Sequence, residues 1–229
     1  DDGIAVAYML AVLDDDTLKH PALECVITTD EEIGLLGAKA LDTSVLKGTH
    51  MINMDSEEEG YLWISCAGGL SGTSRIPVEY QEMEGVVTEV LIDGLNGGHS
   101  GAEIDKNRAN ANKLMGLFLY ELGQKIGYSI KDLSGGTKDN AITRSCKAAI
   151  VTDAEDVEEV KAVAEKLQAE LRAEYAGSDE GITISVTPGK EETVEALSLV
   201  SKEKVVFYLV HVPFGIEKMS GEIEGLVET

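Results

Sequence analysis

Helix-like and strand-like hydrophobic patterns alternate in the first third of the chain. Residues 4–13 (IAVAYMLAVL) are apolar and helix-favouring, and the two aspartates before them place negative charge at a predicted helix N-terminus. Residues 23–28 and 51–54 are short apolar runs of β character, and residues 34–41 return to helical spacing. Helices that alternate with buried strands predict part of an open mixed α/β sheet, in which ligands bind beyond the carboxyl ends of the strands.

After about residue 68 the pattern changes to glycine-punctuated strands and two long helices. The first helix is predicted over 105–125, with Leu114, Phe118 and Leu122 on one stripe, and the second over 154–175. The predicted strands are 74–79, 88–94, 148–152 and 182–186. This arrangement predicts an α+β domain with an antiparallel sheet and two helices. A further helix is predicted to start at 191.

The change of pattern divides the chain into three predicted parts. They are an α/β part over 1–68, the α+β domain over 69–190, and the start of another unit over 191–229. The chain begins at Asp1 without a methionine and stops directly after an apolar stretch, so we expect it to be the interior of a longer protein.

The charge balance excludes some classes of partner. The chain has 42 acidic and 19 basic residues, a formal net charge of −23, and only 5% aromatic residues. Such a field repels phosphate backbones and anionic membranes, so we expect no nucleic-acid and no membrane partner. Most of this acidity is explained by a solvated surface, and a smaller part by carboxylates gathered to hold cations.

Cysteine use and hydropathy favour a cytoplasmic location. The three cysteines, Cys25, Cys66 and Cys146, are widely spaced and odd in number, which is typical of small buried side chains in a reducing compartment. No apolar run approaches the roughly 20 residues that cross a bilayer, and no signal-peptide pattern begins the chain.

Acidic residues stand at three boundaries of the predicted α/β part. Asp1 precedes the first helix, Glu31 and Glu32 follow the first strand, and Asp55 follows the second. A pair of divalent metals needs carboxylates from several strand ends and one that bridges them. Asp1, Glu32 and Asp55 are therefore candidate ligands, and Glu31 is a candidate base for a metal-bound water. The alternative is that Asp30 to Glu32 simply cap the following helix.

Seven segments, in order along the chain, together resemble the aminoacyl-histidine dipeptidases, a branch of the di-zinc carboxypeptidase, deacetylase and dipeptidase family. They are DDGI (1–4), TTDEEIG (28–34), INMDSEEEG (52–60), CAGG (66–69), GLNGGHSG (94–101), GGTKDNAI (135–142) and EIEGLVET (222–229). The resemblance implies a di-zinc catalytic domain at 1–68 and a lid domain beyond it. It also implies two Zn²⁺ ions per full-length subunit, with Co²⁺ or Mn²⁺ as substitutes.

The resemblance implies a role for each matching acid in the first part. Asp1 would bridge both metals, Glu32 and Asp55 would be ligands of one metal each, and Glu31 would be the general base. The implied reaction is hydrolysis of a short peptide of the Xaa-His type by a zinc-activated water.

Three residues of the implied lid would reach the substrate. His99 would contact the substrate or the tetrahedral intermediate, Asn140 would hydrogen-bond the substrate, and Arg144 would bind its carboxylate. His99 has glycines before it and Ser-Gly after it, which favours an exposed imidazole on a loop. A homodimer through the lid is a partner that the resemblance allows.

The sequence also departs from the family pattern. The family's imidazole ligands come from an upstream His-x-Asp and a distant downstream His, and neither is present here, so we expect this chain alone to be inactive. His20, His50 and His211 match no ligand position; we interpret them as a turn, a structural and a buried core histidine. The alternatives are a deacetylase or tripeptidase of the same family, or a non-catalytic dimerisation or interaction module.

Overall fold

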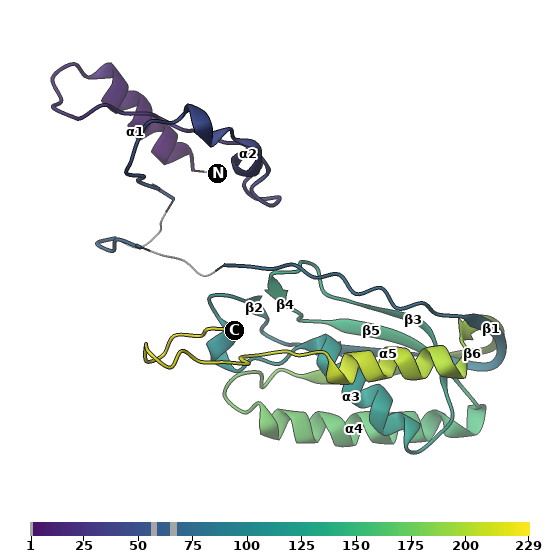
Figure 1. Cartoon of the computed structure of the whole chain (residues 1–229). Coiled ribbons are helices and arrows are strands. Elements are labelled where there is room, and N and C mark those ends of the chain that lie inside the picture. Colours follow the sequence, from purple (N-terminus) through teal and green to yellow (C-terminus); the bar gives the residue numbers. More distant parts are fainter. Residues whose placement is uncertain (1, 56–58, 65–67) are drawn as a thin grey trace. The chain divides into compact units, whose positions relative to one another are not determined.

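A computed structural model gives the fold of the chain, and it describes residues 2–55, 59–64 and 68–229. The chain divides into two compact units, Asp1–Gly69 and Leu70–Thr229 (Figure 1). The three-part division expected from the sequence stays a prediction. None of the helices in the described part of the chain combines the length and apolarity that a membrane crossing requires.

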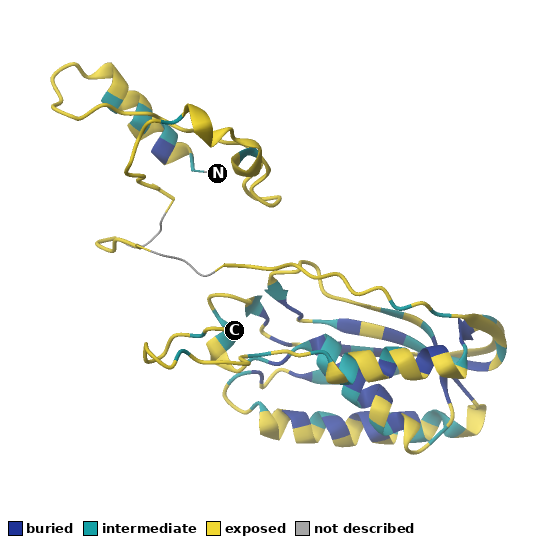
Figure 2. Cartoon of the chain, in the orientation of Figure 1, coloured by how far each residue is buried: buried dark blue, intermediate teal, exposed yellow. Residues whose placement is uncertain are grey.

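The first unit consists of short helices and irregular backbone. Helix α1 (Gly3–Asp14) is capped by Asp2, whose Oδ1 accepts from the Ala5 N–H at 3.1 Å, and α2 (Leu36–Ala40) follows. The described part of this unit also contains a 3₁₀ turn at Thr43–Val45. Ala5 is the one buried residue in the described part of this unit, and the apolar side chains of α1 are largely exposed (Figure 2).

The strands expected at 23–28 and 51–54 are not formed. Strands are stabilised by hydrogen bonds and side-chain contacts with neighbouring strands. No strand in the described part of the first unit pairs with either run, so the apolar pattern alone does not make a sheet. The helix expected at 34–41 is present in shorter form.

The second unit contains a four-stranded antiparallel sheet, which confirms the predicted α+β fold (Figure 1). Its strand order is β3-β5-β1-β6, and a separate two-stranded sheet pairs β2 with β4. The strands are β1 (Tyr80–Asp93), β2 (Gly98–His99), β3 (Ser129–Gly135), β4 (Ala141–Ile142), β5 (Cys146–Thr152) and β6 (Thr183–Leu197). The helices are α3 (Ala111–Gly123), α4 (Val157–Glu174) and α5 (Leu199–His211), with 3₁₀ turns at Ile104–Lys106 and Ala154–Asp156.

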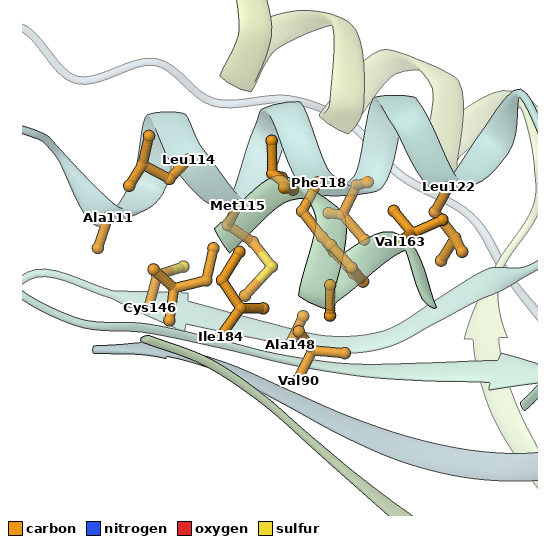
Figure 3. Packing of buried hydrophobic residues seen from close by; sticks show 14 of the residues in the cluster. Val90, Ala111, Leu114, Met115, Phe118, Leu122, Cys146, Ala148, Val163 and Ile184 are labelled. Carbon is orange, nitrogen blue, oxygen red and sulfur yellow. The ribbon is translucent and has the colours of Figure 1, made fainter. Parts of the chain in front are cut away.

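The core lies between one face of the four-stranded sheet and helices α3 and α4 (Figure 3). Phe118 and Met115 of α3 are fully buried and belong to one cluster with Val90 of β1, Ala148 of β5 and Val163 of α4. The members of this cluster recur at alternate positions in the strands and at helical spacing in the helices. The apolar stripes recognised in the sequence are therefore the buried faces of this layer.

Three elements differ from the sequence expectation. Helix α3 begins at Ala111 because Asn110 caps it, with Oδ1 accepting from the Asn112 N–H at 2.9 Å. The helix expected from 191 is wrong: residues up to Leu197 continue β6, and Ser198 caps α5 instead. Pairing with Tyr80–Val86 of β1 extends the strand, although its glutamates are poor strand formers. The strand expected at 74–79 is not formed: β1 begins only at Tyr80 and runs to Asp93, so it includes most of the strand expected at 88–94.

Candidate functional site

The acidic residues proposed as a metal site lie on exposed backbone of the first unit. Glu31, Glu32 and Asp55 are all exposed, whereas Asp1 lies outside the described residues. In the part of the chain that the structure describes, no three His, Cys, Asp or Glu side chains come close enough to hold a metal ion. The roles of these four residues stay predictions.

The alternative that the acidic run caps the next helix is not what the structure shows. The N-cap position of α2 is Leu35, which makes no side-chain capping bond, and the first turn holds no acidic residue. The run lies in a tight loop instead, where Asp30 has φ of 58° and the Leu36 N–H donates to the Asp30 carbonyl at 3.1 Å. Asp30 is in the left-handed region, which aspartate tolerates better than most residues.

The three predicted lid residues lie around the small β2–β4 sheet of the second unit, where strand pairing brings together two segments about forty residues apart in the chain. His99 of β2 pairs with Ala141 of β4, and the adjacent Ser100 N–H donates to the Asn140 carbonyl at 3.0 Å. Arg144 follows β4, and its Nε donates to the Leu95 carbonyl at 3.2 Å, on the loop that leads into β2. His99, Asn140 and Arg144 are each exposed.

The imidazole of His99 is oriented by the turn that follows it. Its Nδ1 lies 3.0 Å from the Gly101 backbone nitrogen and 3.2 Å from that of Ala102. Both partners are N–H donors, so Nδ1 accepts and the neutral ring carries its hydrogen on Nε2. His99 therefore presents an Nε2–H donor that has no partner in the described part of the chain.

Glu103 closes the same turn with charged hydrogen bonds. Its Oε2 accepts from the His99 N–H at 2.9 Å, while its Oε1 lies 2.8 Å from Nζ of Lys106 and 3.1 Å from Nη1 of Arg108. The same Arg108 nitrogen donates to the Gly97 carbonyl. The hydrogen bonds from Lys106 and from the His99 amide, with the charge of Arg108, hold the pKa of Glu103 at about 2.

Asp179 anchors both ends of the loop that carries His99. Its fully buried carboxylate accepts from the Asn96 N–H at 2.5 Å and from the Ala109 N–H at 2.7 Å. Backbone N–H groups at the two ends of the loop therefore donate hydrogen bonds to the same carboxylate. Sequence reasoning missed both Asp179 and Glu103. Glu103 carries a local signal, four residues after His99, but Asp179 is distant in the chain and only folding brings it to the loop.

A cleft of about 500 Å³ lies beside β4. It is lined by residues of the β2 loop, the β3–β4 turn and the segment after β4: Asn96, Gly98, Gly136, Thr137, Ala141, Ile142, Thr143, Arg144 and Ser145. Among its lining residues, Thr137, Thr143 and Ser145 carry hydroxyl groups and Arg144 carries a guanidinium, which can bind a small anionic group.

Two expectations about single residues are corrected. His211 is exposed at the end of α5 rather than buried, with Nδ1 lying 2.8 Å from the Phe207 carbonyl and its ring stacked on Phe207. Cys25 is exposed, and no sheet in the described part of the chain covers its segment, whereas Cys146 is buried as expected and Cys66 lies outside the described residues. His20 and His50 are exposed and are hydrogen-bonded to immediate neighbours.

Comparisons with known proteins agree with the pattern of motifs. Residues 92–179 match a family described as the peptidase dimerisation domain. The chain is 35% identical to the cytosol non-specific dipeptidase of Escherichia coli over 231 residues, covering 100% of this chain and 47% of that protein. The crystal structure of aminoacylhistidine dipeptidase from Vibrio alginolyticus matches with a TM-score of 0.73 and 28% identity, over 99% of this chain and 46% of that one.

This chain is related to the aminoacyl-histidine dipeptidases. The resemblance stated from the motifs is therefore confirmed, and so is the α+β fold of the dimerisation domain. A shorter match, 38% identity over 60 residues, links the chain to the uncharacterised protein YqjE of Bacillus subtilis, covering 25% of this chain and 16% of that protein. The chain spans about half the length of the dipeptidase relatives.

Proposed function

We propose that this chain is part of a cytoplasmic dipeptidase whose second unit supplies both substrate-binding groups and a dimerisation surface. The match over the whole chain to a protein named cytosol non-specific dipeptidase is the observation that carries the proposal. The location of His99, Asn140 and Arg144 around one small sheet supports it. The homodimer rests on the match to the peptidase dimerisation domain.

The chemistry of the second unit follows from its donors. The Nε2–H of His99 would donate to the oxygen of the scissile carbonyl, where negative charge develops as water attacks. The guanidinium of Arg144 would bind the carboxylate of a short peptide, because its planar donors match two oxygens at once. Asn140 would hydrogen-bond the peptide backbone. These roles favour a small anionic substrate.

The described carboxylates do not by themselves fit a two-metal centre. Glu31, Glu32 and Asp55 form no metal-holding group in the part of the chain that the structure describes. The assignment of Asp1, Glu32 and Asp55 as ligands, and of Glu31 as the general base, remains a proposal that rests on the family motifs.

Metal analysis separates the dipeptidase from the interaction module. In a protein of the relatives' full length that contains this chain, about two zinc ions per chain would support the peptidase. A purified protein without bound zinc, Co²⁺ or Mn²⁺ would support the module instead. Glu31→Gln should abolish turnover and leave the metal content intact. Unimpaired turnover in that variant would remove Glu31 as the base.

Substrate assays with a His99 variant test the second unit. We expect Xaa-His dipeptides to be cleaved faster than tripeptides or N-acetyl amino acids. His99→Ala should lower kcat by about 10²–10³, the loss typical of one oxyanion donor. His20→Ala is the matched control, because His20 is also exposed but lies outside the small sheet. Equal activity of the two variants would contradict the role of His99.

A further inference from the structure

The turn from His99 to Glu103 is closed by two hydrogen bonds between the same two residues. The Glu103 N–H donates to the His99 carbonyl at 2.9 Å, and the Glu103 carboxylate accepts from the His99 N–H at 2.9 Å. Inside this turn, the amides of Gly101 and Ala102 face Nδ1 of the imidazole. The orientation of the ring is therefore coupled to the closure of the turn.

The basic partners of Glu103 extend this closure to the start of the loop. Arg108 bridges the carboxylate and the Gly97 carbonyl, two residues before His99. The backbone between them favours glycine, because Gly98 has φ of 143° and a Cβ there would meet Nη1 of Arg108 and lie 2.6 Å from Oε2 of Glu103. Charged hydrogen bonds of this kind are stronger than neutral ones.

We propose that Glu103 is a positioning residue for His99. By closing the turn, it holds the Gly101 and Ala102 amides on Nδ1 and so fixes the hydrogen on Nε2, where the proposed function needs a donor. The inference rests on that function for its catalytic meaning, but the orientation of the ring is a property of this chain and is tested on it directly.

The local acids provide both a conservative variant and a control. Glu103→Gln keeps an oxygen that accepts from the His99 N–H but loses the ion pairs with Lys106 and Arg108. Glu103→Ala loses both kinds of contact. Asp105→Ala is the matched control, because Asp105 is an exposed acid in the same loop whose side chain makes no hydrogen bond or ion pair in the described part of the chain.

The experiment is NMR of the 229-residue chain labelled with ¹⁵N. Two-bond ¹H–¹⁵N correlations identify the tautomer of His99, and the His99→Gln variant assigns the ring signals to this residue. Backbone amide exchange reports whether the turn is closed. We expect wild type to be held as the Nε2–H tautomer, with protected amides at Gly101 and Ala102. Glu103→Ala should mix the tautomers and speed exchange of these two amides by about tenfold or more. Glu103→Gln should restore most of the protection.

Two results would overturn the proposal. One is unchanged tautomer and exchange in Glu103→Ala, and the other is an equal change in Asp105→Ala. If Glu103→Ala also loses protection of the Phe118 amide in the core, the fold has changed and this variant is not informative. Glu103→Gln is then the deciding variant. If its core amides exchange as in wild type but the Nε2–H tautomer is not recovered, the proposal is overturned. The proposed function fails separately, if His99→Ala leaves turnover of the relatives' full-length protein unchanged.

Discussion

Asp179 allows a quantitative test of how the His99 loop is held. The side chain is 0% exposed and accepts two backbone hydrogen bonds, from Asn96 and Ala109. Asp179→Ala removes the acceptor of both donors, and an unsatisfied buried N–H costs about 1–3 kcal/mol. Ala109 is fully buried and bears this cost in full, whereas Asn96 is exposed and can turn to water. Loss of the Asn96 hydrogen bond adds about 1 kcal/mol, so we expect a total loss of about 2–4 kcal/mol in the free energy of unfolding.

The assay is urea unfolding of the 229-residue chain followed by far-ultraviolet circular dichroism. Fluorescence of Trp63 is unsuitable, because the only tryptophan lies in the first unit and Asp179 lies in the second. Asp179→Asn should lose most of the same energy, since its amide keeps one acceptor oxygen but turns a donor towards the other N–H. Asp105→Ala serves as the exposed control. A loss below about 0.5 kcal/mol in Asp179→Ala, the size of an ordinary surface change, would refute the anchoring argument.

Three further changes test the core and the loop. Phe118→Ala should cost about 3–5 kcal/mol in chemical unfolding, because Phe118 is fully buried; Phe207→Ala, at 63% exposed, should cost far less. Gly98→Ala should cost about 1–3 kcal/mol through its positive φ and its contact with Glu103, whereas Gly127→Ala, which has open space, should not. Burial raises the pKa of Cys146 to about 12, so its contribution to stability is intact below about pH 9 and is lost as the pH rises towards 12. In Cys146→Ala, the free energy of unfolding should fall less steeply between about pH 9 and pH 12, by about 1 kcal/mol per pH unit. An unchanged slope in pH-dependent unfolding would contradict burial of the thiol.

The sequence by itself determined the elements whose buried face follows from their own hydrophobic pattern. Helices α3 and α4 were predicted because apolar residues recur at helical spacing, and the same residues form the core. The motifs also determined the relationship to the dipeptidases, because seven short segments occur in order along the chain. The exposure of His99 was predictable from its flanking glycines alone.

Tertiary structure decided everything that depends on a partner strand. The apolar run at 23–28 has no partner strand in the described part of the chain and forms no strand, whereas the polar segment at 191–197 becomes one because β1 lies beside it. The same reason governs the site. Pairing of β2 with β4 brings His99 next to Asn140, and folding brings Asp179 to the loop from about eighty residues away. Local pattern fixes which face of an element is apolar, but hydrogen bonds between distant segments fix which side chains meet.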